Sequence, residues 1–494
     1  MTLFSVSENL LLILSSMPLI GIFFLLSVPS DNKPTCLRLA LFTTCLTFLF
    51  SIFLWILFDP STSFFQFNKT LFYFSNLNFY YIIGVDGISL FFIILTTFLI
   101  TLCVLLSWYS VQFYLKEYLI SFLILEFCLI QVFCVLDLLL FYIFFESVLI
   151  PMFLIVGVWG SRLRKIRAAY QFFLYTLVGS LFMLLGIIYI FFNKGSFDLQ
   201  ILSLSNFTLL YQLILWLSFF ASFAVKIPMV PFHIWLPEAH AEAPTAGSVI
   251  LAGILLKLGG YGFLRFSLPL FPLASVYFAP LVFTLSLVAI IYASLTTLRQ
   301  VDLKKIIAYS SVSHMGFVTI GIFSFNIQGL EGSIILMLSH AFVSSALFLC
   351  VGILYDRHQT RIIKYFSGLV YVMPIFTIFL LFFSFSNIGF PGTSSFIGEI
   401  LVLFGCIKVN LMLTFFMTLG VILSACYSIW LLNRLSFGVL TTHYFSFFQD
   451  LSRREFWLLF PLVILIFWMG LYPFSFISEI HFSVLNLLEH SKND

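Results

Sequence analysis

The sequence predicts an all-α protein that crosses a membrane many times. Hydrophobic residues make up 62% of the 494 residues and charged residues only 9%, whereas a soluble domain carries about 25% charged residues. Apolar runs recur along the whole chain, each close to the ~20 residues needed to cross a hydrocarbon core of ~30 Å. These observations exclude a soluble globular fold and indicate a polytopic helical membrane protein.

The apolar runs, and the polar, proline or glycine clusters that separate them, place about fourteen transmembrane helices. They cover residues 9–29, 38–58, 87–108, 117–135, 137–158, 169–192, 209–240, 244–267, 276–296, 302–322, 332–354, 371–407, 411–433 and 455–478. The seventh and twelfth of these spans are longer than one crossing requires, and we expect each to be a broken helix.

The distribution of basic residues supports this map. Sixteen of the 23 Lys and Arg, including Lys304, fall in or beside the loops after odd-numbered spans, and four, including Arg265, fall in the opposite loops. Lys226 and Lys257 lie inside spans, and Lys492 lies in the tail. The positive-inside rule places the sixteen in the matrix or cytoplasm and both termini on the other side.

Spans 4–8 and 9–13 form two consecutive five-helix units, whose fourth helices are interrupted by KIPMVP and NIGFPG. Because five is odd, the second unit enters from the opposite side, which is the inverted-repeat plan of transporters. The predicted division is 1–112 (helices 1–3), 113–267 (first repeat), 268–433 (second repeat) and 434–494 (helix 14 and tail). Two unrelated proline kinks remain an alternative, since proline and glycine are common in transmembrane helices.

Ionisable residues lie part-way along several spans, where a charge costs at least ~2.5 kcal/mol and indicates function. They are Glu126, Glu146, Lys226, Lys257, His314, His340 and Glu399, and His233 and His240 follow the first helix break. A lysine that gains or loses a carboxylate partner can bind or release a proton, so these residues can form a chain of proton-holding sites. A static ion pair between Glu146 and Lys226, and a purely structural hydrogen bond from His340, remain alternatives.

No motif for a bound metal or cofactor is present. The eight cysteines form no CxxC pair or other metal-ligand spacing, and no GxxxxGK[ST] or strand-linked GxGxxG loop occurs. The basic residues are scattered through short loops, which also argues against a nucleic-acid partner.

Five stretches of the chain are similar to a known family. They are GVDGISLFF (84–92), LLLFYIFFESVLIPMF (138–153), FAVKIPMVPFHIWLPEAHAEAPTAGSVILAGILLKLGGYGFLRF (223–266), DLKKIIAYSSVSHMG (302–316) and FPGTSSFIGE (390–399). They resemble the antiporter-like (Mrp-related) subunits of respiratory complex I, especially those of plant and algal mitochondria. The similarity is weaker in the first 80 residues and after about residue 435.

The resemblance implies a core membrane-arm subunit of NADH:ubiquinone oxidoreductase (H⁺-translocating, EC 7.1.1.2). The expected location is the mitochondrial inner membrane, with both termini in the intermembrane space. In this family, residues matching Glu146, Lys226, Lys257 and Glu399 translocate protons, and His233, His240, His314, His340 and, less directly, Glu126 are further candidates. NADH, FMN, iron–sulfur clusters and ubiquinone are expected in other subunits. The family's subunits 2 and 5, supernumerary subunits and lipids such as cardiolipin are expected neighbours.

Three other functions remain open. A subunit of a cation/proton antiporter without electron chemistry has the same buried charges. A plastid NADH-dehydrogenase-like complex is a closer alternative, and in a purely structural role the charges would only hold the helices together.

Overall fold

The computed structural model describes residues 2–74, 79–205, 207–440 and 448–493. The chain divides into two compact units. The first unit consists of Met1–Lys226, Tyr261–Tyr277 and Ser478–Asp494, and the second of Ile227–Gly260 and Phe278–Ile477. These units do not coincide with the four predicted segments. Compactness does not test the inverted-repeat topology, so that division stays a prediction.

The first unit is a helical bundle with one hairpin. Its elements are α1 (Thr2–Ser27), α2 (Lys33–Leu57), β1 (Gln66–Phe74), β2 (Phe79–Val85), α3 (Gly87–Ser110), α4 (Leu115–Cys134), α5 (Leu138–Ser147), α6 (Leu149–Trp159), α7 (Lys165–Lys194), α8 (Leu199–Ser203), α9 (Leu209–Lys226), η3 (Phe263–Ser267), α13 (Leu268–Leu270) and most of α21 (Phe474–Asn493).

All the regular elements described in the second unit are helices. Its elements are α10 (Trp235–Glu242), α11 (Thr245–Ile250), η2 (Leu251–Leu255), most of α12 (Leu256–Gly262) and of α14 (Pro272–Arg299), α15 (Leu303–Ile322), α16 (Ile327–His358), η4 (Ile363–Tyr365), η5 (Leu369–Tyr371), α17 (Pro374–Ile388), α18 (Ser394–Ile407), α19 (Leu411–Ser436) and α20 (Arg453–Leu471).

The helical membrane architecture is confirmed. Twelve segments of the described chain are long and apolar enough to cross a membrane. The predicted span at 302–322 corresponds to α15, and the broken span at 371–407 corresponds to the shorter helices α17 and α18. The other predicted break separates α9 from α10. The number of crossings and the repeats stay predictions.

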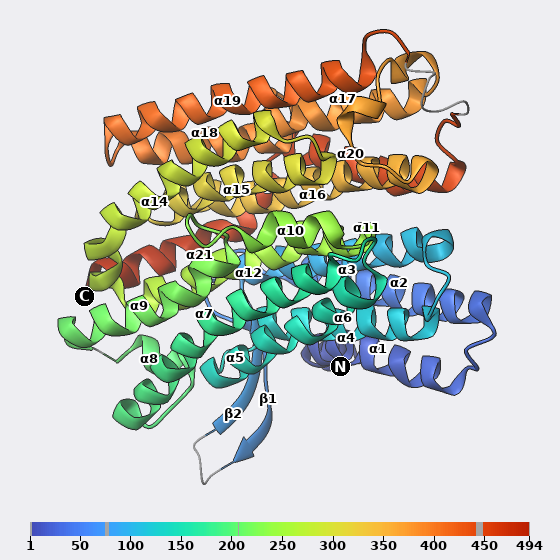
Figure 1. Ribbon diagram of the computed structural model, residues 1–494. Coiled ribbons are helices and arrows are strands. Elements are labelled where there is room, and N and C mark those ends of the chain that lie inside the picture. Colours follow the sequence, from blue (N-terminus) through green and yellow to red (C-terminus); the bar gives the residue numbers. More distant parts are fainter. Residues whose placement is uncertain (1, 75–78, 206, 441–447, 494) are drawn as a thin grey trace. The chain divides into compact units, whose positions relative to one another are not determined.

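The β1–β2 hairpin departs from the all-α prediction. Its strands pair antiparallel, with Gln66 opposite Val85, and the hairpin projects from the helices of the first unit (Figure 1). The amide of Leu136, just after α4, donates to the carbonyl of Ile82 in β2 at 3.0 Å. The segment is rich in aromatic residues and includes two consecutive isoleucines, and both residue types favour strands. Pairing of the two strands provides hydrogen bonds for their backbone N–H and C=O groups, which no helix satisfies.

The predicted fifth and eighth spans are interrupted helices. The fifth breaks at Val148, between α5 and α6, because Pro151 has no amide to donate to the carbonyl four residues earlier. The eighth contains two π-helical segments, η2 and η3, on either side of α12. Such segments are rare and often occur at functional sites.

The C-terminal end also differs from the prediction. The last predicted span extends to residue 478, but α20 ends at Leu471 and a separate helix, α21, begins at Phe474. Pro473 follows Tyr472, the C-cap of α20, and disfavours a helical conformation at that residue. In the first unit α21 packs against the start of α3, where the Gly87 amide donates to Ser483 Oγ at 3.0 Å. A Cβ atom at Gly87 would lie 2.0 Å from the Glu479 carbonyl oxygen, so this approach requires glycine.

Helix α16 forms the centre of the second unit, where it packs against α15, α17, α18 and α20. Two glycines allow α16 and α18 to approach closely. A Cβ atom on Gly332 would lie 2.7 Å from Leu401 Cβ, and one on Gly398 would lie 2.9 Å from Leu336 Cα. Small residues commonly permit such packing in membranes, and here it brings Glu399 of α18 into the core.

Candidate functional site

Glu146 and Lys226 come together in the first unit. Glu146 lies near the end of α5, and Lys226 is the last residue of α9. Lys226 Nζ lies 4.4 Å from the centroid of the Phe145 ring, and the charges of Glu146 and Lys226 interact. Among the described residues, neither Lys226 Nζ nor Glu146 Oε1 has a hydrogen-bond partner. Burial without a partner is costly, so the pair stays a candidate site, and its role as a fixed ion pair or as a pair that changes contact or charge stays a prediction.

Four predicted residues form a continuous series in the second unit. Lys257 Nζ of α12 lies 2.8 Å from His340 Nδ1 of α16. The rings of His340 and His314 have centroids 5.6 Å apart, and His314 Nδ1 of α15 lies 3.5 Å from Glu399 Oε1 of α18. None of the four residues is more than 5% exposed. The series therefore joins four buried ionisable groups through successive contacts.

The surroundings of this series leave room for polar contacts. Tyr427 Oη lies 3.3 Å from His314 Nε2. A cavity with about 10 Å³ open to the centre of a water-sized sphere is lined by residues of α15–α18, namely His314, Leu336, His340, Val343, Ser386, Asn387 and Ser395. That space is close to the ~10–15 Å³ that one water molecule requires.

The break between α17 and α18 shapes the end of the series. Gly389 has φ +82°, and a Cβ atom there would lie 2.5 Å from Glu399 Oε2. Glycine is thus required both by the backbone conformation and by the carboxylate beside it. The predicted position of Glu399 just after the break is confirmed.

The two histidines after the first break have different environments in the second unit. His240 is completely buried, and its ring stacks on Phe348 at 4.6 Å with an interplanar angle of 6°. Neither ring nitrogen of His240 has a hydrogen-bond partner among the described residues. The charge of Lys257 acts on His240. His233 instead packs edge-on against Tyr292 at 5.6 Å.

Glu126 stands apart from the other candidates. It is completely buried in α4 and accepts a hydrogen bond from Thr47 Oγ1 of α2 at 2.6 Å. No contact described for Glu126 joins it to Glu146 or Lys226, although all three lie in the first unit. Its part in proton transfer stays a prediction.

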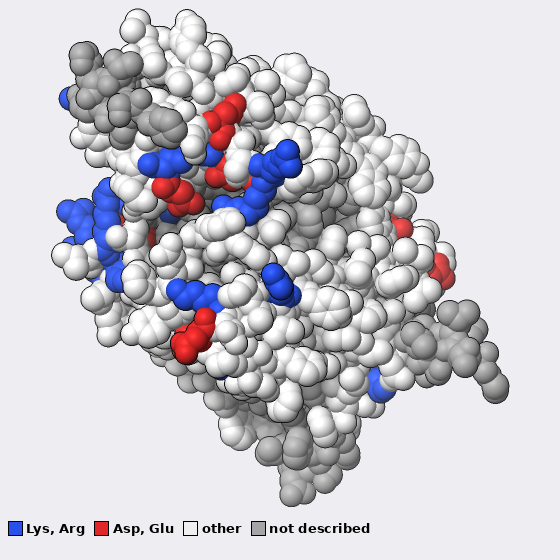
Figure 2. All heavy atoms as spheres, turned by 90° about the vertical axis from the view of Figure 1, so that its right-hand side faces the viewer, with Lys and Arg blue, Asp and Glu red and all other residues white. Residues whose placement is uncertain are grey.

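A group of charged residues in the second unit lies deeper than the sequence indicated. We call Glu242, Asp302, Lys304, Asp356 and Arg361 the α15 cluster. Lys304 is 2% exposed and Arg361 1% exposed, although the sequence counted both among the residues in or beside the basic loops. Arg361 pairs with Glu242 at 3.7 Å and with Asp302 at 3.6 Å. Figure 2 shows a face of the molecule on which Lys and Arg side chains gather, with Asp and Glu among them.

Arg265 is a second buried charge, which the count of basic residues grouped with a loop although it falls within the predicted span 244–267. It lies in η3, is 8% exposed, and its Nη2 pairs with Asp86 Oδ1 at 2.5 Å. Its Nε donates to Tyr261 Oη at 3.1 Å, and its guanidinium carbon lies 4.8 Å from the Phe65 ring centroid. Burial favours the neutral form of Asp86, but Arg265 and hydrogen bonds with Ser89 outweigh it and hold the pKa of Asp86 below its usual value.

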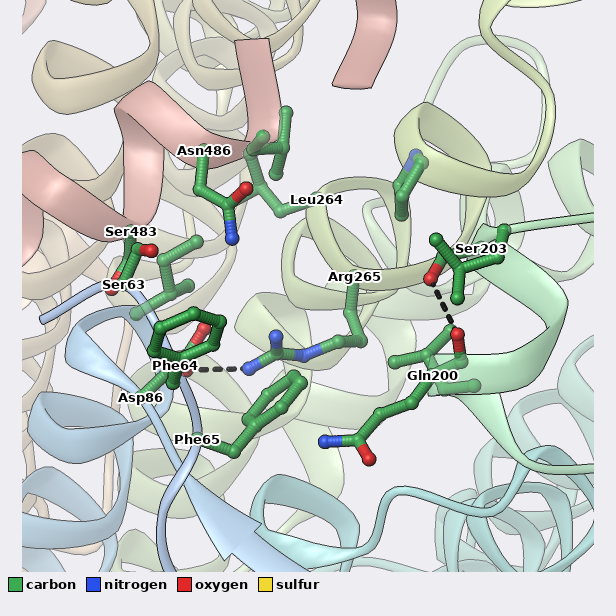
Figure 3. Close-up of a pocket in the computed structure, with 15 residues that line it drawn as sticks. Ser63, Phe64, Phe65, Asp86, Gln200, Ser203, Leu264, Arg265, Ser483 and Asn486 are labelled. Atoms are coloured by element: carbon green, nitrogen blue, oxygen red, sulfur yellow. Dashed lines mark hydrogen bonds and ion pairs between the residues drawn. The ribbon is translucent and has the colours of Figure 1, made fainter. Parts of the chain in front are cut away.

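This pair lines a pocket of about 500 Å³ in the first unit (Figure 3). Gln200 of α8 and Asn486 of α21 lie on either side of Arg265 in that view. Elements outside the predicted spans therefore converge on the ion pair. The local signal that identifies Asp86 is its position as the N-cap of α3, but its partner 179 residues away has no local signal.

Comparison with known proteins identifies the family of this chain. A family model described as NADH:quinone oxidoreductase/Mrp antiporter, transmembrane, matches residues 136–426. NADH-ubiquinone oxidoreductase chain 4 of Chondrus crispus is 71% identical over 97% of this chain and 98% of its own length. Chain 4 of Marchantia polymorpha is 60% identical over 97% of each chain. This chain belongs to the NADH-ubiquinone oxidoreductase chain 4 family.

Solved structures extend the chain 4 match to three dimensions. A chain in the structure of respiratory complex I from Thermus thermophilus with bound NADH has a TM-score of 0.88 and 28% identity, covering 97% of this chain and 99% of that chain. A chain of the archaeal membrane-bound sulfane sulfur reductase has a TM-score of 0.84 at 22% identity over 96% of this chain and 77% of that chain, which shows a shared fold. The resemblance to antiporter-like complex I subunits is confirmed.

The family model covers most of the predicted site of this chain 4 protein. Residues 136–426 include Glu146, Lys226, Lys257, Glu399 and the four candidate histidines but exclude Glu126. The match therefore covers the residues that the structure joins in the second unit and leaves out the one that stands apart.

Arg265→Ala is expected to destabilise this protein by about 3–5 kcal/mol, because the substitution leaves the Asp86 carboxylate buried without its cation. Thermal unfolding of the purified complex measures this loss of stability. The release of this subunit from the complex reports the transition. Ionised Asp86 contributes to the free energy of unfolding. This contribution is fully present above the unfolded-state pKa of about 3.9, and it is lost as pH falls through the lower folded-state pKa.

Exposed Lys408→Ala is the matched control and should leave the unfolding temperature unchanged. The double variant Asp86→Asn/Arg265→Met should recover much of the loss, since neither charge is then left alone. An unchanged unfolding temperature in Arg265→Ala would contradict a structural role for the pair.

Proposed function

We propose that this chain carries one proton-conducting path in the membrane arm of NADH:ubiquinone oxidoreductase (complex I). Its chain 4 relatives and the complex I match make it a subunit of that enzyme, and the antiporter-like region fits proton translocation. The observation that carries the proposal is the series Lys257–His340–His314–Glu399. Each member can bind and release a proton, and each touches the next.

Proton transfer along this series conserves charge at each step. The Lys257 ammonium gives a proton to His340 Nδ1 and becomes a neutral amine, ready to accept the next proton. His340 releases a proton from its other ring nitrogen toward His314, which passes one to the Glu399 carboxylate. The lysine suits this role because, unlike arginine, it can lose its proton when buried.

Glu146 and Lys226 would control this path through their charges. When Glu146 approaches Lys226, the ion pair favours the charged ammonium, and when it withdraws, burial favours the neutral amine. The close ring of Phe145, and the absence of a hydrogen-bond partner for Lys226 Nζ among the described residues, support a pair with more than one arrangement. Redox energy released in other subunits would drive the change, and protons would enter from the basic side.

The setting of the protein follows from the same proposal. The enzyme uses NADH and ubiquinone outside this subunit, and FMN and iron–sulfur clusters would also lie in other subunits. Neighbouring subunits 2 and 5, supernumerary subunits and cardiolipin would contact the exposed helices. The protein would lie in the mitochondrial inner membrane with both termini in the intermembrane space.

Purification with its native partners tests the proposal against its alternatives. Complex I predicts that the chain co-purifies with rotenone-sensitive NADH oxidation, and that the reconstituted complex acidifies one side of a vesicle when NADH is added. Sodium-dependent proton exchange without NADH oxidation would instead indicate the antiporter. Recovery from plastid membranes rather than mitochondria would indicate the plastid complex.

A further inference from the structure

His314, the third member of the series, has a polar partner at each of its ring nitrogens. Its Nδ1 lies 3.5 Å from Glu399 Oε1 of α18, and its Nε2 lies 3.3 Å from Tyr427 Oη of α19. All three residues are buried and belong to the second unit. In the proposed transfer the carboxylate at Nδ1 accepts the proton, whereas the hydroxyl at Nε2 has no role. Tyr427 therefore needs an explanation of its own.

The hydroxyl of Tyr427 is the feature to explain, because phenylalanine would supply the same ring. Tyr427 is 2% exposed, and burying a hydroxyl is costly unless it forms hydrogen bonds. The structure gives this hydroxyl a contact with the ring of an ionisable residue. Tyrosine thus adds a contact with His314 that phenylalanine cannot provide.

Packing alone does not fix the His314 ring. The ring borders the small cavity that it shares with His340 and Asn387, so there is space beside it. Of the polar contacts described for the His314 side chain, the one to Tyr427 is shorter than the one to Glu399. A ring with free space beside it and a long contact to its acceptor can turn away from that acceptor. The contact at Nε2 restrains this turn.

A tyrosine hydroxyl suits a partner whose charge changes, because it can both donate and accept a hydrogen bond. It donates to Nε2 when that nitrogen carries no proton and accepts from Nε2–H when it does. In the second case the O–H needs another acceptor, and the side chains of Ser310, Ser313 and Asn387 interact with the Tyr427 hydroxyl. The two serine hydroxyls donate to backbone carbonyls of α15 at 2.8 Å, so their oxygens can still accept.

We propose that Tyr427 is a positioning residue of the proton path, which holds the His314 ring with Nδ1 toward Glu399 whether the ring is neutral or charged. The inference rests on the proposed function and adds to its series a residue from a further helix, α19, that acts through His314. Tyr427 keeps its own proton throughout. Transfer still moves one proton from Nδ1 of the charged His314 ring to the Glu399 carboxylate, which leaves a neutral ring and a carboxylic acid.

Removal of this hydroxyl in the intact complex tests the role. Tyr427→Phe keeps the ring and the packing but leaves Nε2 of His314 without its restraint. It is expected to lower NADH-driven pumping by reconstituted vesicles, per assembled complex, at least tenfold, because a misplacement of about 1 Å can cost about 10²-fold. Tyr371→Phe is the matched control, since Tyr371 is 79% exposed, and it should pump at the unaltered rate.

Two further measurements show whether Tyr427 acts through His314. The double variant His314→Gln/Tyr427→Phe should pump no less than His314→Gln alone, as expected for residues that act as one unit. Infrared difference spectra of the complex with isotope-labelled histidine, recorded with and without NADH, supply the second readout. The band that is absent from His314→Gln belongs to His314, and Tyr427→Phe should shift it. A tyrosine that only fills space beside α15 would not move this band.

The outcomes separate this inference from the proposed function. Normal pumping per assembled complex in Tyr427→Phe overturns the inference, and so does an unchanged His314 band or a further loss in the double variant. Failure of Tyr427→Phe to assemble also overturns it and assigns the hydroxyl a structural role. If Lys257→Met and His314→Gln lose pumping while Tyr427→Phe retains it, only the positioning role fails. If Lys257→Met and His314→Gln both pump normally, the proposed function fails with it.

Discussion

Lys257→Met is expected to reduce proton pumping at least ~100-fold while the complex still assembles. Lys257 is completely buried, and its Nζ contacts only His340 Nδ1 and the Ala252 carbonyl among the described residues. Methionine has a similar length and flexible shape, so packing is largely kept. The exchangeable proton is lost, and a positioned acid–base group contributes roughly 10²–10⁴-fold.

NADH-driven acidification by reconstituted vesicles measures this effect, and native gel electrophoresis of the complex measures assembly. Lys408 lies directly after α18 and is exposed. Lys408→Met therefore removes a lysine without touching the series and should pump normally. Full pumping by an assembled Lys257→Met complex would refute the proposed path at its first contact.

Glu146→Gln and Lys226→Met are each expected to lower pumping at least tenfold, and the double variant should be no worse than the more severe single variant. Residues that act as one unit show such non-additivity. The physical reason is that each charge controls proton binding by the other, so removing either one ends the control. Pumping by vesicles containing each variant supplies the three values.

A static ion pair makes the opposite prediction for this pair. Each single variant would then weaken assembly by leaving one buried charge alone, and the double variant would restore it. Exposed Glu117→Gln, in the first turn of α4, is the control for loss of an acid outside the site. Restored assembly in the double variant, together with normal pumping, would establish the structural alternative.

The candidate site shows which functional residues a sequence pattern can predict and which contacts between them it cannot. A charge inside an apolar run can be found without a structure, because burying it is costly in any arrangement of the helices. Glu146, Lys226, Lys257, His314, His340 and Glu399 were all identified in this way. The order of contact between Lys257, His340, His314 and Glu399 depends on how α12, α15, α16 and α18 pack, which hydropathy does not contain.

Lys304 and Arg265 show where that approach fails. Both lie at or near the end of an apolar run, where a basic residue normally reaches water, so their sequence context indicates a topology signal. Their burial results from elements distant in sequence. The Ala243 carbonyl meets Lys304, and Asp86 and Phe65 meet Arg265. The same limit applies to the β1–β2 hairpin and α21, which contact Leu136 and Gly87, residues distant from them or outside their own element.

The sequence by itself determined the membrane fold class, the two broken helices and the identity of most buried ionisable residues. Each depends on local quantities, namely the length of an apolar run, the missing amide of proline and the cost of a charge among apolar neighbours. Only the tertiary structure decided which of those charges touch, which loop residues are buried and which spans contain π-helical segments. These features depend on contacts between residues far apart in the chain, and no local pattern specifies such contacts.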